Sequence, residues 1–89
     1  MSSMDNDLVL AHAHSSMHRV EVLGSSICGC FYCMVIFPPS DVVEWVDEDP
    51  SGQGQTALCP KCGIDSVIGD RSGFSIDAKF LVAMSERWF

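Results

Sequence analysis

The chain has 89 residues and carries twelve acidic side chains against five Lys and Arg, so its formal net charge is −7. Proteins bind a phosphate backbone through Lys and Arg, so this charge disfavours nucleic-acid binding and favours a basic protein partner. A domain of this size has a thin stability margin, and we expect a covalent or metal cross-link to support its core.

The N-terminal residues determine where we expect the chain to be found. Residues 1–7 are polar and predict a disordered lead-in to one domain over residues 8–89. They lack the basic region of a secretory signal peptide, and no segment approaches the roughly 20 apolar residues of a membrane span. We therefore expect a cytoplasmic protein whose thiols stay reduced.

The residues around the first cysteines predict short elements. Residues 15–23 suit a short helix that ends at Gly24, although the alternation of Val20 and Val22 also permits a strand. The apolar run over residues 34–37 predicts a buried strand, which the next two prolines terminate.

A second helix is predicted over residues 41–48. Ser40 is a suitable N-cap, and Val42, Trp45 and Val46 have the spacing of one apolar helix face. Acidic residues near its end oppose the helix dipole, so this helix should be short and held by packing.

The middle of the chain contains loops and short elements. Residues 49–55 are rich in Gly, Ser and Pro and predict a loop, and residues 56–58 predict a short strand. Residues 64–68 permit one or two helical turns, or a strand over residues 66–68. Residues 70–73 predict a turn.

The strongest predicted helix lies at the C-terminal end. Ser75 is a suitable N-cap, and Ile76, Phe80, Met84 and Trp88 recur every four residues. This period places the four side chains on one face, so we expect that face to be buried.

Two Cys-x-x-Cys motifs predict a metal centre. Cys30 and Cys33 form the first pair, and Cys59 and Cys62 form the second. Two such pairs in a reduced chain are typical of one structural Zn²⁺ held by four thiolates, which leaves no open position for catalysis. Gly63 directly follows the second pair and permits the positive φ that commonly closes such a turn. The chain is therefore predicted to be an α+β domain of the zinc-ribbon or treble-clef kind, with short strands and a C-terminal helix.

Cys28 is the fifth cysteine. We interpret it as a small buried thiol beside the metal centre. Two alternatives stay open. Cys28 could take the place of Cys30 as a ligand, or the protein could be a zinc or redox carrier that uses Cys28.

Three histidines precede the first cysteine pair. His12, His14 and His18 could form a second metal site or an acid–base centre, and in a helix His14 and His18 would share one face. The simpler interpretation is a polar surface patch or a histidine bonded to a carbonyl. Asp65 could cap a helix after the second cysteine pair. A small metal-dependent hydrolase or nuclease would need His14, His18 and Asp65 to converge.

Longer segments resemble a family. The strings CGCFYC (residues 28–33) and TALCPKCGIDSVIG (residues 56–69), the Trp45 segment and the closing Trp-Phe pair resemble a group of small bacterial cytoplasmic proteins of unknown function. The similarity covers residues 14–89. It implies a cytoplasmic location and a bacterial or phage source, and it brings no activity with it.

The function predicted from these observations is protein binding. We expect a non-enzymatic adaptor, inhibitor or immunity-type protein that meets its partner through an acidic surface. The alternatives are the hydrolase or nuclease and the zinc or redox carrier described above.

Overall fold

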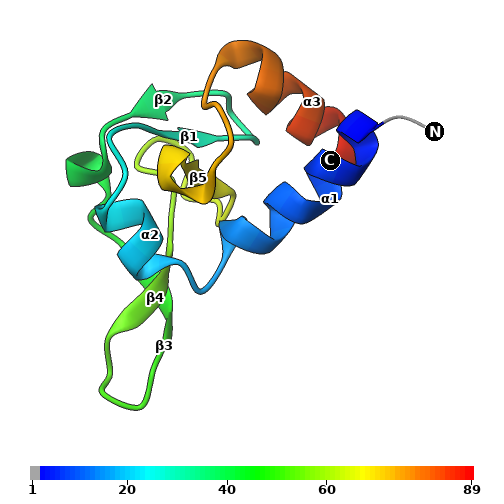
Figure 1. Ribbon diagram of the computed structural model, residues 1–89. Coiled ribbons are helices and arrows are strands. Elements are labelled where there is room, and N and C mark those ends of the chain that lie inside the picture. The colour runs from blue at the N-terminus through cyan, green and yellow to red at the C-terminus, as the bar shows by residue number, and fades with distance from the viewer. Residues whose placement is uncertain (1–2) are drawn as a thin grey trace.

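The computed structural model of the chain describes residues 3–89, with side chains from Leu8 onward. Its helices are α1 (Ser3–His12), α2 (Arg19–Leu23) and α3 (Ala78–Trp88), and its 3₁₀ turns are η1 (Ala13–Ser15), η2 (Pro39–Asp41) and η3 (Asp70–Ser72). Its strands are β1 (Cys28–Cys30), β2 (Ile36–Phe37), β3 (Trp45–Glu48), β4 (Gly54–Ala57) and β5 (Val67–Gly69). The chain is thus a small α+β fold with short antiparallel strands and a C-terminal helix, as predicted (Figure 1).

Strand β1 is the centre of the fold. It pairs antiparallel with β2 on one side and with β5 on the other, in the order β2-β1-β5. Strands β3 and β4 form a separate two-stranded hairpin, which projects away from the rest of the molecule (Figure 1).

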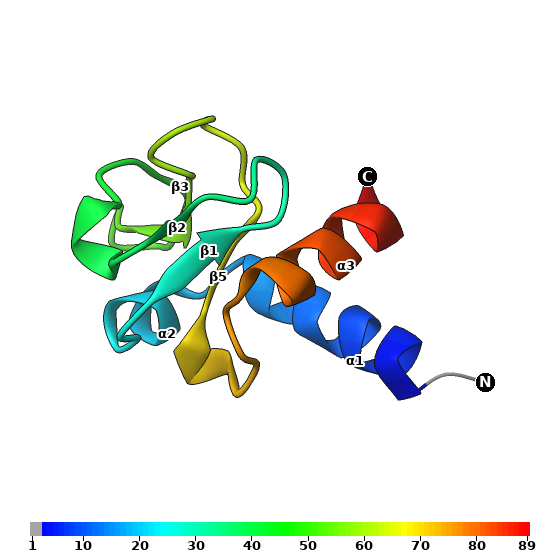
Figure 2. The same cartoon turned by 90° about the horizontal axis from the view of Figure 1, so that it is seen from above.

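The two faces of the three-stranded sheet cover two different cores. Helices α1 and α3 lie side by side along one side of the sheet (Figure 2). Their core contains Leu8, Ala11, Phe31, Ile68, Leu81 and Met84. The other core lies towards α2 and the cysteine motifs and contains Val22, Cys28, Cys30, Phe37, Val42, Ala57, Cys59 and Val67.

Gly29 lets α3 approach the sheet closely. A Cβ atom at this position would lie 2.9 Å from Ile76 Cγ2 and 2.9 Å from Leu81 Cδ1, which is closer than real contacts allow. Of the four side chains predicted on the apolar face of the C-terminal helix, Met84 is fully buried, whereas Ile76, Phe80 and Trp88 are only half-buried. Leu81 is the other fully buried residue of α3. Its N-cap is Asp77 rather than Ser75, because the Asp77 carboxylate accepts the N–H of Phe80 at 2.8 Å.

The helix predicted over residues 41–48 is wrong. Its second half is strand β3, in which Trp45 lies opposite Ala57 of β4. The spacing of Val42, Trp45 and Val46 fits a helix, but β-branched and aromatic residues also favour strands, and pairing with β4 satisfies the backbone. The turn η2 replaces the predicted N-cap.

Other predicted elements are found with different boundaries. Helix α2 ends at Gly24, as predicted, but it begins only at Arg19. Of the two options after the second cysteine pair, the strand is correct, because residues 67–69 form β5. Residues 1–2 of the predicted lead-in lie outside the described residues, and from Ser3 onward the backbone is helical. None of the helices within residues 3–89 has the length and apolar character needed to cross a membrane.

Candidate metal centre

The four cysteines of the two motifs converge on one point. The Sγ atoms of Cys30, Cys33, Cys59 and Cys62 all lie within 4.8 Å of one another. Cys30 Sγ lies 3.7 Å from Cys62 Sγ, and Cys33 Sγ lies 3.6 Å from Cys59 Sγ. A tetrahedral ion with metal–sulfur bonds of about 2.3 Å needs sulfur atoms about 3.8 Å apart, so these residues fit a four-coordinate metal.

The first cysteine turn is closed by two backbone hydrogen bonds. Met34 N donates to Cys30 O at 2.9 Å, and Cys30 N donates to Val35 O at 3.0 Å. The N–H of Tyr32 lies 3.3 Å from Cys30 Sγ. Met34 has a φ of 67°, which is unusual for a residue with a side chain.

The second cysteine turn repeats this geometry. Gly63 N donates to Cys59 O at 3.0 Å, and Cys59 N donates to Ile64 O at 3.0 Å. The N–H groups of Lys61 and Cys62 point at Cys59 Sγ, at 3.4 and 3.5 Å. Gly63 has a φ of 76°, as the sequence predicted. The two turns are thus related as a pseudo-symmetric pair.

The electrostatics of the sulfur atoms differ. Burial raises the pKa of Cys33 and raises that of Cys62 to about 12. Burial also acts on Cys59, but N–H groups from Cys62 and Lys61 oppose it, and the pKa of Cys59 lies below its ordinary value. Cys59 therefore loses its proton more readily than an ordinary thiol, whereas burial opposes deprotonation of Cys33 and Cys62, which a bound cation would favour.

Cys28 lies apart from this cluster. It is fully buried on β1, as predicted, and it is not among the four cysteines that converge. Burial and the nearby charge of Asp70 raise the pKa of its thiol to about 11. A buried neutral thiol is a poor nucleophile and a poor ligand, so these observations do not favour the carrier alternative.

His18 is a buried structural residue. Its Nδ1 atom lies 2.6 Å from His14 O, and its Nε2 atom accepts the N–H of Ala57 at 3.1 Å. The backbone N–H of His18 donates to Gln55 O. These partners require the neutral ring protonated on Nδ1, and both ring nitrogens are therefore used. Burial lowers the pKa of His18, although the His14 carbonyl and the Glu21 charge raise it to a smaller extent.

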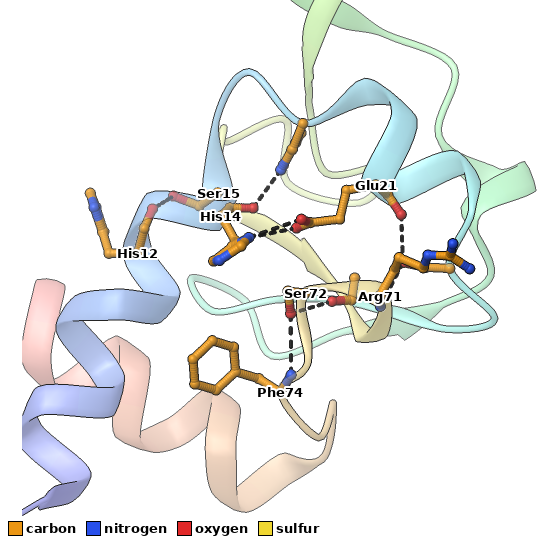
Figure 3. A network of polar contacts seen from close by, with 10 residues as sticks. His12, His14, Ser15, Glu21, Arg71, Ser72 and Phe74 are labelled. Atoms are coloured by element: carbon orange, nitrogen blue, oxygen red, sulfur yellow. Dashed lines mark hydrogen bonds and ion pairs between the residues drawn. The ribbon is translucent and has the colours of Figure 1, made fainter.

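His14 is engaged in a separate surface contact. Its Nδ1 atom lies 3.0 and 2.9 Å from the two carboxylate oxygens of Glu21 (Figure 3). The Glu21 carbonyl in turn accepts the Ser25 hydroxyl, which also accepts the N–H of Arg71. The His14–Glu21 contact thus ties η1 to α2, and Ser25 ties the end of α2 to the turn η3.

The three residues that the hydrolase alternative requires do not converge. His14 and His18 line one open groove, whereas Asp65 lines a different cavity together with His12. Asp65 caps no helix, because the chain after the second cysteine pair enters β5. Within the described residues, the four cysteines are the only group of metal-ligating side chains that come together.

Comparison with known proteins places the chain in no family, since no family model, no curated protein and no solved structure matches it.

Sequence reasoning missed two features of this region. One is the second ring contact of His18. A histidine bonded to a carbonyl was expected and is found at His14 O, but acceptance of the Ala57 N–H by the other ring nitrogen shows only when β4 is brought beside it. The other is an aromatic cavity lined by His12, Ser15, Ser16, Phe31, Asp65, Trp88 and Phe89. These residues come from four separate segments, and the closing Trp-Phe pair was the only signal in the sequence.

Proposed function

We propose that the chain is a zinc-stabilised protein-binding module of the bacterial cytoplasm, which meets a basic partner through an acidic surface. The four-cysteine cluster supports the metal part of this proposal. Four thiolates fill a tetrahedral zinc shell, which gives the ion a structural role. The second cysteine turn leads into a strand rather than a helix, which favours the zinc-ribbon assignment over the treble clef.

The observation that carries the binding part of the proposal is the charge of the projecting hairpin. Residues 44–57 contain four acidic residues and no Lys, Arg or His. Glu44, Asp47 and Glu48 are exposed. Asp49 is tied to the turn, because its carboxylate accepts the N–H groups of Ser51 and Gln53. An exposed arm of one charge sign suits the recognition and steering of a partner of opposite sign.

The two free carboxylates of this hairpin provide the test. Glu44 and Glu48 have no side-chain hydrogen bond or ion pair within residues 8–89, whereas Asp47 accepts the Thr56 hydroxyl at 2.7 Å. The double variant Glu44→Lys/Glu48→Lys should therefore keep the fold. We expect it to lose a partner recovered from the native host by the unmodified chain, with the larger loss at low salt.

The matched control is Asp41→Lys/Glu86→Lys, which reverses two exposed charges outside the hairpin. This variant should retain the partner. Equal binding by the hairpin variant and the unmodified protein, both folded and metal-loaded, would contradict the proposal. Turnover of a substrate by the metal-loaded chain that depends on His14 or Asp65 would favour the hydrolase instead.

A further inference from the structure

The cavity beside the first cysteine turn combines aromatic rings with one carboxylate. It has a volume of about 360 Å³ and lies where the end of α3 meets η1 and the two cysteine turns. The rings of Phe31 and Phe89 are 5.8 Å apart, and that of Tyr32 meets Phe89 edge-on at 5.0 Å. Phe89 is 64% exposed and Tyr32 is 50% exposed, so this aromatic surface is open to a partner.

Asp65 is the only acidic side chain that lines this cavity. Its carboxylate is exposed and has no hydrogen bond or ion pair to any residue whose side chain the structure describes. No Lys or Arg lines the cavity. The negative charge at its mouth is therefore not neutralised from within the described chain.

Trp88 completes one wall and is already engaged. Its ring lies against that of His12 at a centroid distance of 3.9 Å and an interplanar angle of 31°, and its Nε1 donates to Leu8 O at 3.2 Å. The guanidinium of Arg87, which does not line the cavity, lies 4.6 Å from the centre of the Trp88 ring. The indole thus accepts a cation from its own chain, and the face left for a ligand is that of Phe89.

From this combination we propose that the cavity binds the Lys or Arg side chain of a basic protein partner. The cationic head would lie against Phe89 and pair with Asp65, and the apolar stem would pack on the aromatic walls. A carboxylate beside an open aromatic face in a chain of net charge −7 is complementary to such a group. The inference rests on the proposed function only for the source of the cation, namely a protein.

The two indole groups of the protein provide a spectroscopic test. Trp88 lines the cavity, whereas Trp45 lies on the hairpin and serves as an internal control. The ¹⁵N-labelled, metal-loaded chain is titrated with blocked Gly-Lys-Gly and Gly-Arg-Gly peptides, and with a peptide that has norleucine in place of lysine. We expect the cationic peptides to shift the Trp88 indole signal, whereas a shift of Trp45 alone would report attraction to the acidic hairpin rather than binding in the cavity.

Three variants test separately the charge of Asp65, the ring of Phe89 and the effect of a negative charge elsewhere on the surface. Asp65→Asn should weaken binding of the cationic peptides roughly tenfold, and Phe89→Leu should weaken it severalfold because it keeps an apolar side chain but removes the ring. The matched control Asp41→Asn removes the same charge from the exposed turn η2 and should leave the affinity within about twofold.

Several results would overturn the inference. Equal binding of the norleucine peptide would make the cavity an apolar site, and equal effects of Asp65→Asn and Asp41→Asn would leave no local role for Asp65. Free butylamine binding as tightly as the peptides would indicate a small-amine site, and no shift of Trp88 would exclude a site. If the peptides do not bind the cavity but the hairpin variant loses its partner, only the cavity proposal is refuted. If the peptides bind the cavity but the hairpin variant keeps its partner, the acidic hairpin is refuted as the binding surface.

Discussion

At the scale of single residues, the two cysteine turns show what a backbone conformation demands of the sequence. Met34 and Gly63 occupy equivalent positions, four residues after Cys30 and Cys59, and both have a positive φ. Glycine adopts this conformation without a steric penalty, whereas a residue with a Cβ atom is strained there. Met34 is held in it by packing against the core between α1 and α3.

We therefore predict that Gly63→Ala destabilises the protein by about 1–2 kcal/mol and weakens metal binding. An added Cβ would meet no atom within 4 Å, so the effect comes from φ alone. Gly52→Ala is the matched control, since Gly52 has a φ of 85° and equally open surroundings but lies in the hairpin turn. Urea unfolding should show similar losses for both, and metal competition should show weaker binding only for Gly63→Ala.

His18 gives a residue-scale prediction about pH. Its pKa is lowered in the folded protein, so the unfolded chain binds a proton more readily. Stability contributed by His18 is therefore complete above its unfolded pKa of about 6.5 and is lost as the pH falls below that value. His14 and Glu21 also act on this ring, with smaller effects than burial.

The measurement compares the unmodified protein with His18→Gln, which cannot titrate. The difference in their free energies of unfolding should shrink between pH 7.5 and pH 5.5, whereas acid effects on the cysteines are common to both and cancel. A difference that stays constant over this range would show that His18 is not held neutral.

At the scale of elements, the position of α3 depends on the side chain of Leu81 and on the absence of a side chain at Gly29. Leu81 is fully buried against β1 at Gly29. Val82, the next residue, is 43% exposed. Where α3 meets β1, the packing therefore depends on both positions together.

We predict that Leu81→Ala lowers stability by about 2–5 kcal/mol, because it leaves a cavity under the helix. Val82→Ala should change stability by only about 0.5 kcal/mol. Gly29→Ala should also destabilise, and the double variant Gly29→Ala/Leu81→Ala should cost less than the sum of the single changes, since the smaller residue makes room for the added methyl group. Strict additivity in thermal melts would show that the two residues do not touch.

The elements also show which parts of the structure the sequence predicts. The C-terminal helix was predicted because eleven residues repeat its period several times. Strand β3 was predicted as a helix because the spacing of Val42, Trp45 and Val46 matches one face of a helix, and pairing with the hairpin partner β4 overrides this period. The convergence of the four cysteines was predicted because each pair is local in the sequence, whereas the aromatic cavity arises from contacts between remote segments.

At the scale of the whole molecule, the cysteine cluster joins the three-stranded sheet to the hairpin. Cys30 and Cys59 lie in the core towards α2, and Cys33 and Cys62 pack against it. The cluster thereby connects β1 to the end of the hairpin. In a chain of 89 residues, the remaining apolar core gives only a thin margin of stability.

Removal of the metal should therefore unfold the protein. Zinc binding in such small sites contributes on the order of 10 kcal/mol, so chelation or Cys59→Ser should abolish the far-ultraviolet circular dichroism of the native state. Cys28→Ser is the control that removes a thiol outside the cluster, and it should retain one zinc per chain in elemental analysis. A chelated protein that keeps its native spectrum would rule out a stabilising metal.

The first cysteine turn also places consecutive residues in different environments. Cys30 belongs to the metal cluster, whereas its neighbour Phe31 lines the aromatic cavity, and Asp65 lies three residues after Cys62. Two walls of the cavity are thus fixed only when both turns are formed, which makes occupancy of the two sites thermodynamically linked. By reciprocity, a ligand that favours the ordered cavity raises the affinity for the metal by the same factor. A bound partner would then slow the transfer of zinc to a chelator. The rate of that transfer would report partner binding without any change to the residues that bind the partner.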